Sequence, residues 1–346
     1  MLLHIFSFSY DTTVKPFLHY NYIADFFFVL SGVVLYDFYM REFANKRMKD
    51  SNYIKFFRKR FKRFFPVLFI SLILSTLLFL VEKIAFNLAD KPLNVFPERS
   101  LSGAIVMLLF FQFIYLPAFF ILPNAWGVSV EFLGNIILMF KPFIKNNYGL
   151  LSLAIIGILC MELGLKYELQ FEGLNYGTNG LPALGRAIVG LAAGFLVKRN
   201  AKKLEKIYSP KLFFLVVVVF FLGFRWPLHD LTTNPLVMDL LFGVIMIYLI
   251  KWNFSKNSVI GKLSFVGGGI SYPFYLFHGI VLDLVNYLLN MPDDFSKKYP
   301  ESISSVSIRI VATFTLTCLI SYFIENIIRR YGKGKSFGKI LTFKNT

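Results

Sequence analysis

The sequence predicts an all-α membrane protein, a bundle of about ten transmembrane helices. Of its 346 residues, 56% are hydrophobic and 18% aromatic, whereas only 16% are charged. Soluble domains carry about a quarter charged residues, so this composition excludes a soluble globular protein. The second observation is a series of apolar runs, most of them near the roughly 20 residues that a helix needs to cross a bilayer. The lipid bilayer is therefore the expected partner along most of the chain.

Nine apolar runs follow one another, at residues 22–40, 64–81, 101–140, 148–165, 181–197, 212–226, 235–252, 265–290 and 304–324. The chain also begins with an apolar piece, MLLHIFSF, that is too short to span, so we expect the start of a tenth, first helix to be missing or misassigned. The run 101–140 is too long for one straight span and is interrupted by LPNAW at 122–126. It is either two spans, or one span with a re-entrant or interfacial piece.

The distribution of basic residues decides between these alternatives. The stretch 56–66, FFRKRFKRFFP, places five Lys and Arg directly before an apolar run, and the positive-inside rule puts such a cluster in the cytoplasm. If 101–140 crosses once, the loops on that side carry 27 of the 37 Lys and Arg against three acidic residues. We therefore expect a transmembrane domain over 1–330, a basic tail over 331–346 and both termini in the cytoplasm. The net charge of +17 then reports orientation and does not require a nucleic acid partner.

Ionisable side chains inside apolar runs are costly and usually face a cavity or a partner. His4 and Asp25 lie a few residues below the same predicted outer loop on successive helices, so they are expected to meet. A carboxylate beside an imidazole raises its basicity, as in a general base that deprotonates a hydroxyl. The alternative, a histidine that is only a hydrogen-bonded packing residue, stays open. No spacing of Cys and His indicates a metal site.

Arg60 and Arg63 in the basic stretch also have two interpretations. They are either an orientation anchor or a binding site for an anionic group, since guanidinium groups match phosphate oxygens bidentately. The sequence alone leaves both open.

Six segments carry a family resemblance. They are IADFFFVLSGVVLY at 23–36, RFKRFFP at 60–66, WGVSVEF at 126–132, GRAIVGLAAGFL at 185–196, ISYPFYLFHGIV at 270–281 and SYFIENIIRR at 321–330. In this order they resemble the successive motifs of the acyltransferase family 3 membrane proteins, which include bacterial O-antigen and exopolysaccharide O-acetylases.

The resemblance implies a set of site residues. The family's first helix carries an Arg followed eleven positions later by a catalytic His; His4 matches the His, while the Arg would fall before Met1. The other matching positions are Asp25 and Ser31 around the FFVLSG motif, Arg60 and Arg63 of the cytoplasmic Arg-x-x-Arg, Trp126, Ser129 and Glu131, the intramembrane Arg186, and Ser271, Tyr272, Tyr275 and His278.

The resemblance also implies a reaction. Acyl-CoA, with acetyl-CoA the expected form, would be a co-substrate held by Arg60, Arg63 and Arg186, and no bound cofactor is expected. His4 with Asp25 would carry the transfer, with proton transfer by Glu131 or His278 as second candidates.

The expected acceptor is a hydroxyl of a surface carbohydrate, such as lipopolysaccharide or an exopolysaccharide, at the inner (plasma) membrane of a bacterium. The rival from another class is a transporter or flippase for a lipid-linked glycan. A third possibility is an inactive scaffold, because the chain as given lacks the first half of the first helix.

Overall fold

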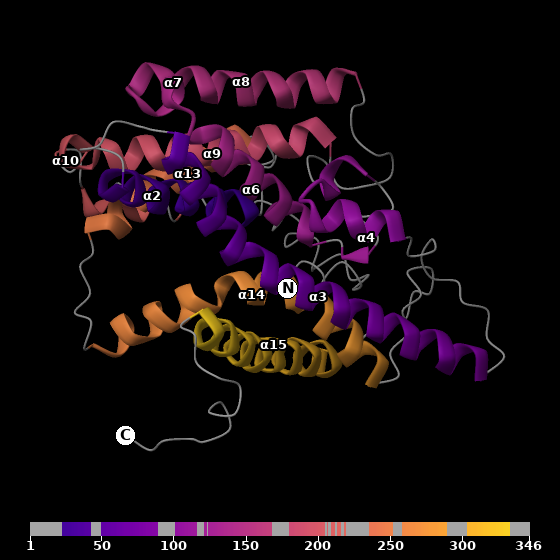
Figure 1. Ribbon diagram of the computed structural model, residues 1–346. Helices are drawn as coiled ribbons and strands as arrows, with labels where there is room; N and C mark the ends of the chain where they lie inside the picture. Colours follow the sequence, from indigo (N-terminus) through magenta and orange to yellow (C-terminus); the bar gives the residue numbers. More distant parts are fainter. Residues whose placement is uncertain are drawn as a thin grey trace. The chain divides into compact units, whose positions relative to one another are not determined.

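The computed structural model describes residues 23–42, 50–88, 101–115, 121–122, 124–167, 180–204, 235–251, 258–288 and 303–332, with short pieces between 206 and 218. Within these ranges the chain forms helices and no strand (Figure 1). The all-α class predicted from composition is therefore confirmed.

The main helices carry the labels of Figure 1. They are α2 (Ile23–Glu42), α3 (Asp50–Leu88), α4 (Leu101–Leu108), the short 3-10 helix η2 (Gln112–Ile114), α6 (Ala125–Leu138), α7 (Lys141–Ile144), α8 (Asn147–Lys166), α9 (Gly180–Arg199), α10 (Ala201–Leu204), α13 (Pro235–Lys251), α14 (Val259–Leu288) and α15 (Ile303–Gly332).

Five stretches in the described ranges are long and apolar enough to cross a membrane: Tyr53–Val81, Asn147–Gly164, Gly180–Arg199, Val259–Leu288 and Ser307–Arg330. Their outer faces expose large apolar side chains, as on α8, where Leu151, Ile155 and Leu159 are about half exposed. Such a face is unfavourable in water and suits lipid. The chain is a membrane protein, and the count of ten spans stays a prediction because the first helix and most of 212–226 lie outside the described residues.

The tract 101–140 is broken in the way its sequence indicates. It forms α4 of eight residues and α6 of 14, and residue 122 lies outside any helix just before α6 begins. At the end of α4, Phe110 takes a φ of 63° and its ring stacks on Phe132 at 4.1 Å between centroids. Neither helix has the length of a straight span, and one net crossing of this tract stays a prediction.

The contacts divide the chain into two compact units. Unit 2 holds α2, the part of α3 up to Phe64, and the helices from α4 to α13. Unit 1 holds the remainder of α3 together with α14 and α15.

Helix α9 is the centre of unit 2 and packs against α2, α6, α8 and α13. Small residues allow this: a β-carbon at Gly194 would collide with the backbone of Val29 on α2, and one at Gly32 would collide with the backbone of Leu191 on α9. Membrane helices associate largely by such close backbone packing, because lipid offers no hydrophobic driving force between them. The glycines of the GLAAG segment therefore fix how near α2 and α9 approach.

In unit 1, α14 and α15 lie side by side (Figure 1). Helix α15 buries polar side chains at four-residue spacing: Arg309, Thr313, Thr317 and Ser321 are each at most 2% exposed. Residues four apart share one helix face. One face of α15 is therefore buried and polar along three turns.

Candidate active site

A buried ion pair joins α2 to α9 in unit 2. The Arg186 guanidinium donates from Nε to Asp25 Oδ1 at 3.1 Å and from Nη2 to Asp25 Oδ2 at 2.7 Å. Both side chains are almost completely buried, at 1% and 0% exposure. A bidentate guanidinium–carboxylate pair has the best geometry for offsetting the cost of desolvating two charges. The close approach of α2 and α9 at their glycines brings these two residues together.

Two further side chains complete the surroundings of the pair. The guanidinium of Arg186 lies 5.5 Å from the centroid of the Trp126 ring on α6. Asp239 of α13 is 1% exposed, and its carboxylate is repelled by Asp25 and attracted by Arg186. Neither of its carboxylate oxygens has a hydrogen-bond partner among the described residues. The missing side chain of Gly190 leaves room for the Asp239 carboxylate, because a β-carbon on Gly190 would lie 3.2 Å from Asp239 Oδ1. Arg186 is therefore hydrogen-bonded to Asp25 and also attracts the Asp239 carboxylate without such a bond.

A hydrogen bond joins two of the sequence motifs. Ser31 on α2 donates to Oε1 of Glu131 on α6 at 2.5 Å, across 100 residues of sequence. This distance is at the short end of those found for a hydroxyl and a carboxylate. The FFVLSG motif and the Trp-x-x-Ser-x-Glu motif therefore form one site rather than two.

The two arginines of the Arg-x-x-Arg pattern lie near this pair. Arg60 is 7% exposed while Arg63 is exposed, and the charges of both exert an attraction on the Glu131 carboxylate. The Arg60 guanidinium lies 5.5 Å from the Phe56 ring centroid, and that of Arg63 lies 5.7 Å from the Phe64 ring centroid. A cation over an aromatic face is held in place while its hydrogen-bond donors stay available. An anionic ligand can therefore meet guanidinium groups that are already positioned.

Helix α2 connects the two parts of the site. Asp25 and Ser31 are six residues apart, about 9 Å of helix rise. All of these groups lie within unit 2: the Asp25–Arg186 pair, the Ser31–Glu131 pair, and the two arginines Arg60 and Arg63. Chemically, this arrangement offers a buried, charge-paired interior beside a cationic cluster.

Ser129 has a local role in this geometry. Its hydroxyl donates to the carbonyl of Ala125 one turn earlier, at 3.1 Å, and its side chain is completely buried. The hydroxyl is therefore used inside α6, and its effect on the site is to fix the helix that carries Trp126 and Glu131.

The remaining motif residues belong to α14 in unit 1. His278 is 4% exposed, and its Nδ1 lies 2.7 Å from the carbonyl oxygen of Tyr275. The hydroxyl of Ser271 donates to the carbonyl of Gly268 at 3.1 Å. Tyr272 lies on the same helix and is partly buried. These contacts are within α14, so they do not test a role in proton transfer.

His4 lies outside the described residues, and its expected contact with Asp25 stays a prediction. The structure gives Asp25 a partner that the sequence did not, namely Arg186. Each oxygen of an ionised carboxylate has two lone pairs. Asp25 can therefore accept from an imidazole as well as from the guanidinium.

The structure adds one residue to those expected. Asp239 was without an assigned role, although an ionisable residue in the apolar run 235–252 is itself a signal of a functional position.

Among the described residues, no group of three or more His, Cys, Asp and Glu could hold a metal ion.

The fold and the site define a helical membrane protein with a buried charge network and an adjoining cationic cluster. A family model described as an acyltransferase domain matches residues 1–335, so the chain belongs to the acyltransferase 3 family. A protein of Acidianus two-tailed virus named "Putative acetyltransferase ORF330" is 24% identical over 278 residues, covering 75% of this chain and 76% of the viral protein. No solved structure matches the chain. The resemblance seen in the sequence is confirmed, and the chain is an acyltransferase.

Proposed function

We propose that this protein moves an acyl group, in the first instance acetyl, from cytoplasmic acyl-CoA to a hydroxyl of a cell-surface carbohydrate. The observation that carries the proposal is the electrostatic attraction of Arg60 and Arg63 for Glu131, which Ser31 hydrogen-bonds. It supports a site at which a polyanionic donor can be held beside a buried polar interior. The expected location is the plasma membrane, with the basic loops on the cytoplasmic side.

The donor end is assigned by charge. Acyl-CoA carries phosphate groups at its nucleotide end, and Arg groups are suited to phosphate oxygens because their donors form a fixed planar fork. Arg63 is exposed and can meet the ligand first, whereas the buried Arg60 is held against Phe56. The pantetheine arm then leads the thioester toward the interior of the bundle.

The transfer step is assigned to His4 and Asp25. His4 would take the proton of the acceptor hydroxyl, and the oxygen would attack the thioester carbonyl carbon. The carbon–sulfur bond breaks, and the CoA thiolate leaves and takes up the proton from His4. Asp25 fixes the tautomer of the imidazole and stabilises its charged form.

Arg186 and Glu131 have supporting roles in this scheme. Arg186 is bound to Asp25 by two hydrogen bonds, so it positions that carboxylate. A contact of Arg186 with the thioester carbonyl or with a phosphate is a secondary element of this proposal. Glu131, held by Ser31, is the second candidate for proton transfer, together with His278.

The family assignment favours this enzyme over the transporter, which has the same kind of polar membrane interior. An acyltransferase must consume a donor, whereas a glycan transporter need not. Donor dependence is therefore the property to measure.

The test uses membranes that contain the full chain, radiolabelled acetyl-CoA, and the surface polysaccharide fraction of the expressing cells as acceptor. We expect label in the polysaccharide only with active protein, and no label with His4→Ala even though that variant still binds acetyl-CoA. Arg63→Glu is expected to raise KM for acetyl-CoA by about tenfold or more, because the charge on a phosphate contact is reversed.

Lys83→Glu is the matched control. Lys83 is exposed and lies twenty residues further along the same helix, so the substitution changes the net charge equally without touching the cluster. If both reversals raise KM alike, the effect is one of net charge and the donor site lies elsewhere. Glycan that crosses the membrane without ever gaining label would overturn the enzymatic assignment.

A further inference from the structure

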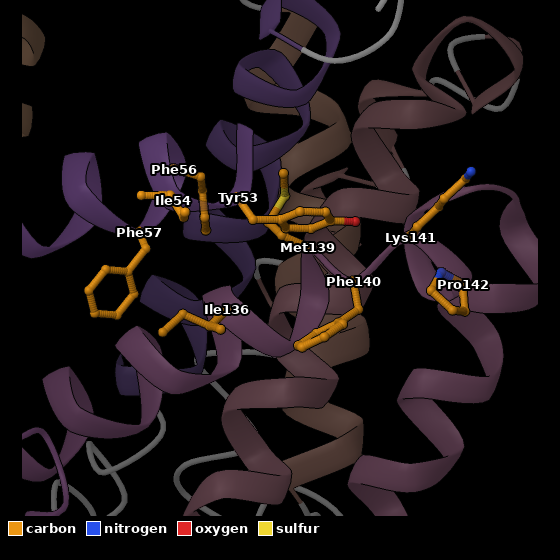
Figure 2. A pocket seen from close by; sticks show the side chains of 9 residues that line it. All are labelled: Tyr53, Ile54, Phe56, Phe57, Ile136, Met139, Phe140, Lys141 and Pro142. Atoms are coloured by element: carbon orange, nitrogen blue, oxygen red, sulfur yellow. The ribbon is translucent and has the colours of Figure 1, made fainter. Parts of the chain in front are cut away.

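An apolar hollow adjoins the cationic cluster. It has a volume of about 460 Å³ and lies between the first turns of α3 and the junction of α6 with α7, all within unit 2. Figure 2 shows its aromatic rings coming from both sides: Tyr53 and Phe57 from α3, and Phe140 from the junction. The volume falls in the range of pockets that bind small molecules, about 300–1,000 Å³.

Two of the rings form an aromatic pair at the hollow. The centroids of Tyr53 and Phe140 are 6.4 Å apart and their planes are inclined at 36°, within the separation of about 4.5–7 Å usual for rings in contact. Phe140 is 53% exposed, so a planar heterocycle can stack on the exposed part of its ring, beside Tyr53.

The hollow and the cluster share a wall. Phe56 lines the hollow, and the guanidinium of Arg60 lies 5.5 Å from the centroid of the same ring. Phe57, another lining residue, packs edge-on against the ring of Phe132, next to Glu131. Along α3, Phe56 precedes Arg60 by one turn and Arg63 by two turns, about 6 and 10 Å of rise. A ligand with a flat apolar end and phosphates one sugar unit away fits this order.

Charge favours such a ligand over a lipid tail. Lys141 at the start of α7 lines the hollow, and Arg60 lies against the ring of Phe56 in its wall. Proteins that bind single-stranded nucleic acid without sequence preference stack the bases on aromatic rings beside cationic side chains, because every base has a π-face. An apolar hollow with Lys141 in its lining and Arg60 at its wall has this character.

We propose that this hollow is the adenine subsite of the acyl donor, with Tyr53 and Phe140 holding the base and Arg60 and Arg63 the adjoining phosphates. The inference rests on the proposed function, since it names where the nucleotide end of the same acyl-CoA lies. It predicts that the base and the phosphates are recognised by separable groups of residues.

The test compares the binding of two probes, CoA and 4′-phosphopantetheine, to the purified full chain in detergent by titration calorimetry. The second probe lacks the adenosine portion. Phe140→Ala is expected to weaken CoA binding by about tenfold, the effect of losing one stacked base, and to leave 4′-phosphopantetheine binding unchanged. Phe140→Trp should retain CoA binding, because it keeps an aromatic face.

Phe314→Ala is the control for a general effect of removing an aromatic side chain. Phe314 on α15 is 51% exposed, against 53% for Phe140, and each packs on one aromatic neighbour, at 5.7 and 6.4 Å between centroids. CoA binding by Phe314→Ala should match that of the unaltered chain.

Other outcomes overturn the inference. If Phe140→Ala weakens both probes equally, or neither, the base does not bind here. If phospholipid that co-purifies with the protein is lost in Phe140→Ala while CoA binding is unchanged, the hollow holds lipid. In both cases Arg63→Glu can still weaken CoA binding, which leaves the proposed function standing. If the unaltered chain binds no CoA at all, the proposed function fails as well.

Discussion

The buried pair of Asp25 and Arg186 allows a sharp test of how unit 2 is held together. Asp25→Ala leaves a completely buried guanidinium without its carboxylate, and breaking a buried pair in this way costs about 3–5 kcal/mol. For a unit of 150–250 residues, each kcal/mol shifts the melting temperature by about 2–4 °C. We therefore expect the Tm of the purified protein to fall on the order of 10 °C.

The same two helices supply the control. Asp37 on α2 and Lys198 on α9 form an ion pair at 3.7 Å whose side chains are 52% and 25% exposed. An exposed pair contributes about 0.2–1 kcal/mol. Asp37→Ala should therefore change the Tm by less than about 4 °C, measured by the same thermal unfolding assay in detergent.

A double variant separates pairing from packing. Replacing both members by apolar side chains, Asp25→Leu with Arg186→Met, removes the charges together and should recover most of the lost stability, because no unpaired charge stays buried. Equal destabilisation by Asp25→Ala and Asp37→Ala would refute the assignment of a buried pair. A double variant no more stable than Asp25→Ala would refute its electrostatic basis.

Three other substitutions test the rest of unit 2 and its packing. Gly194→Ala should abolish or strongly reduce the yield of folded protein, because its β-carbon would collide with backbone; Gly267→Ala, which meets nothing within 4 Å, should be neutral or gain up to about 1 kcal/mol from helix propensity. Equal yields of the two variants in a fluorescence size-exclusion assay would contradict the close packing of α2 and α9. Ser31→Ala should lower kcat/KM for acetyl transfer by about tenfold or more through loss of its hydrogen bond to Glu131, whereas Ser31→Thr should retain activity; loss with both would point to a steric effect. Asp239→Asn should keep or raise the Tm, because neither carboxylate oxygen has a hydrogen-bond partner among the described residues, and desolvation and the repulsion from Asp25 exceed the attraction of Arg186. A clear fall in Tm would mean that the carboxylate is paired.

Some features could be predicted because they depend on local composition. The runs over 148–165 and 181–197 correspond to α8 and α9, and the interruption LPNAW lies where α6 begins. Helix type and burial in lipid follow from the run of apolar residues itself. Asp25 could be chosen for a related reason, since ionisable groups in such runs are rare, whereas Ser31 was indicated by the family resemblance alone.

The partners of these residues could not be predicted from the sequence. Asp25 was expected to meet His4, and its partner in the described residues is Arg186, 161 residues away. Arg186 was expected to hold the donor; its guanidinium is bound to the Asp25 carboxylate, and a contact with the donor stays a prediction. Several arginines and carboxylates lie in apolar runs, and sequence spacing does not select among them.

The sequence by itself determined that the chain lies in a lipid bilayer, that it is helical, and which ionisable residues lie in its apolar runs. The tertiary structure decided which polar side chains meet: Arg186 pairs with Asp25, Ser31 donates to Glu131, and Asp239 lies within electrostatic reach of the first pair. The physical reason is that each pairing depends on how closely α2, α6, α9 and α13 approach. That distance is set by small residues such as Gly190 and Gly194, whose effect appears only when two helices are placed against each other.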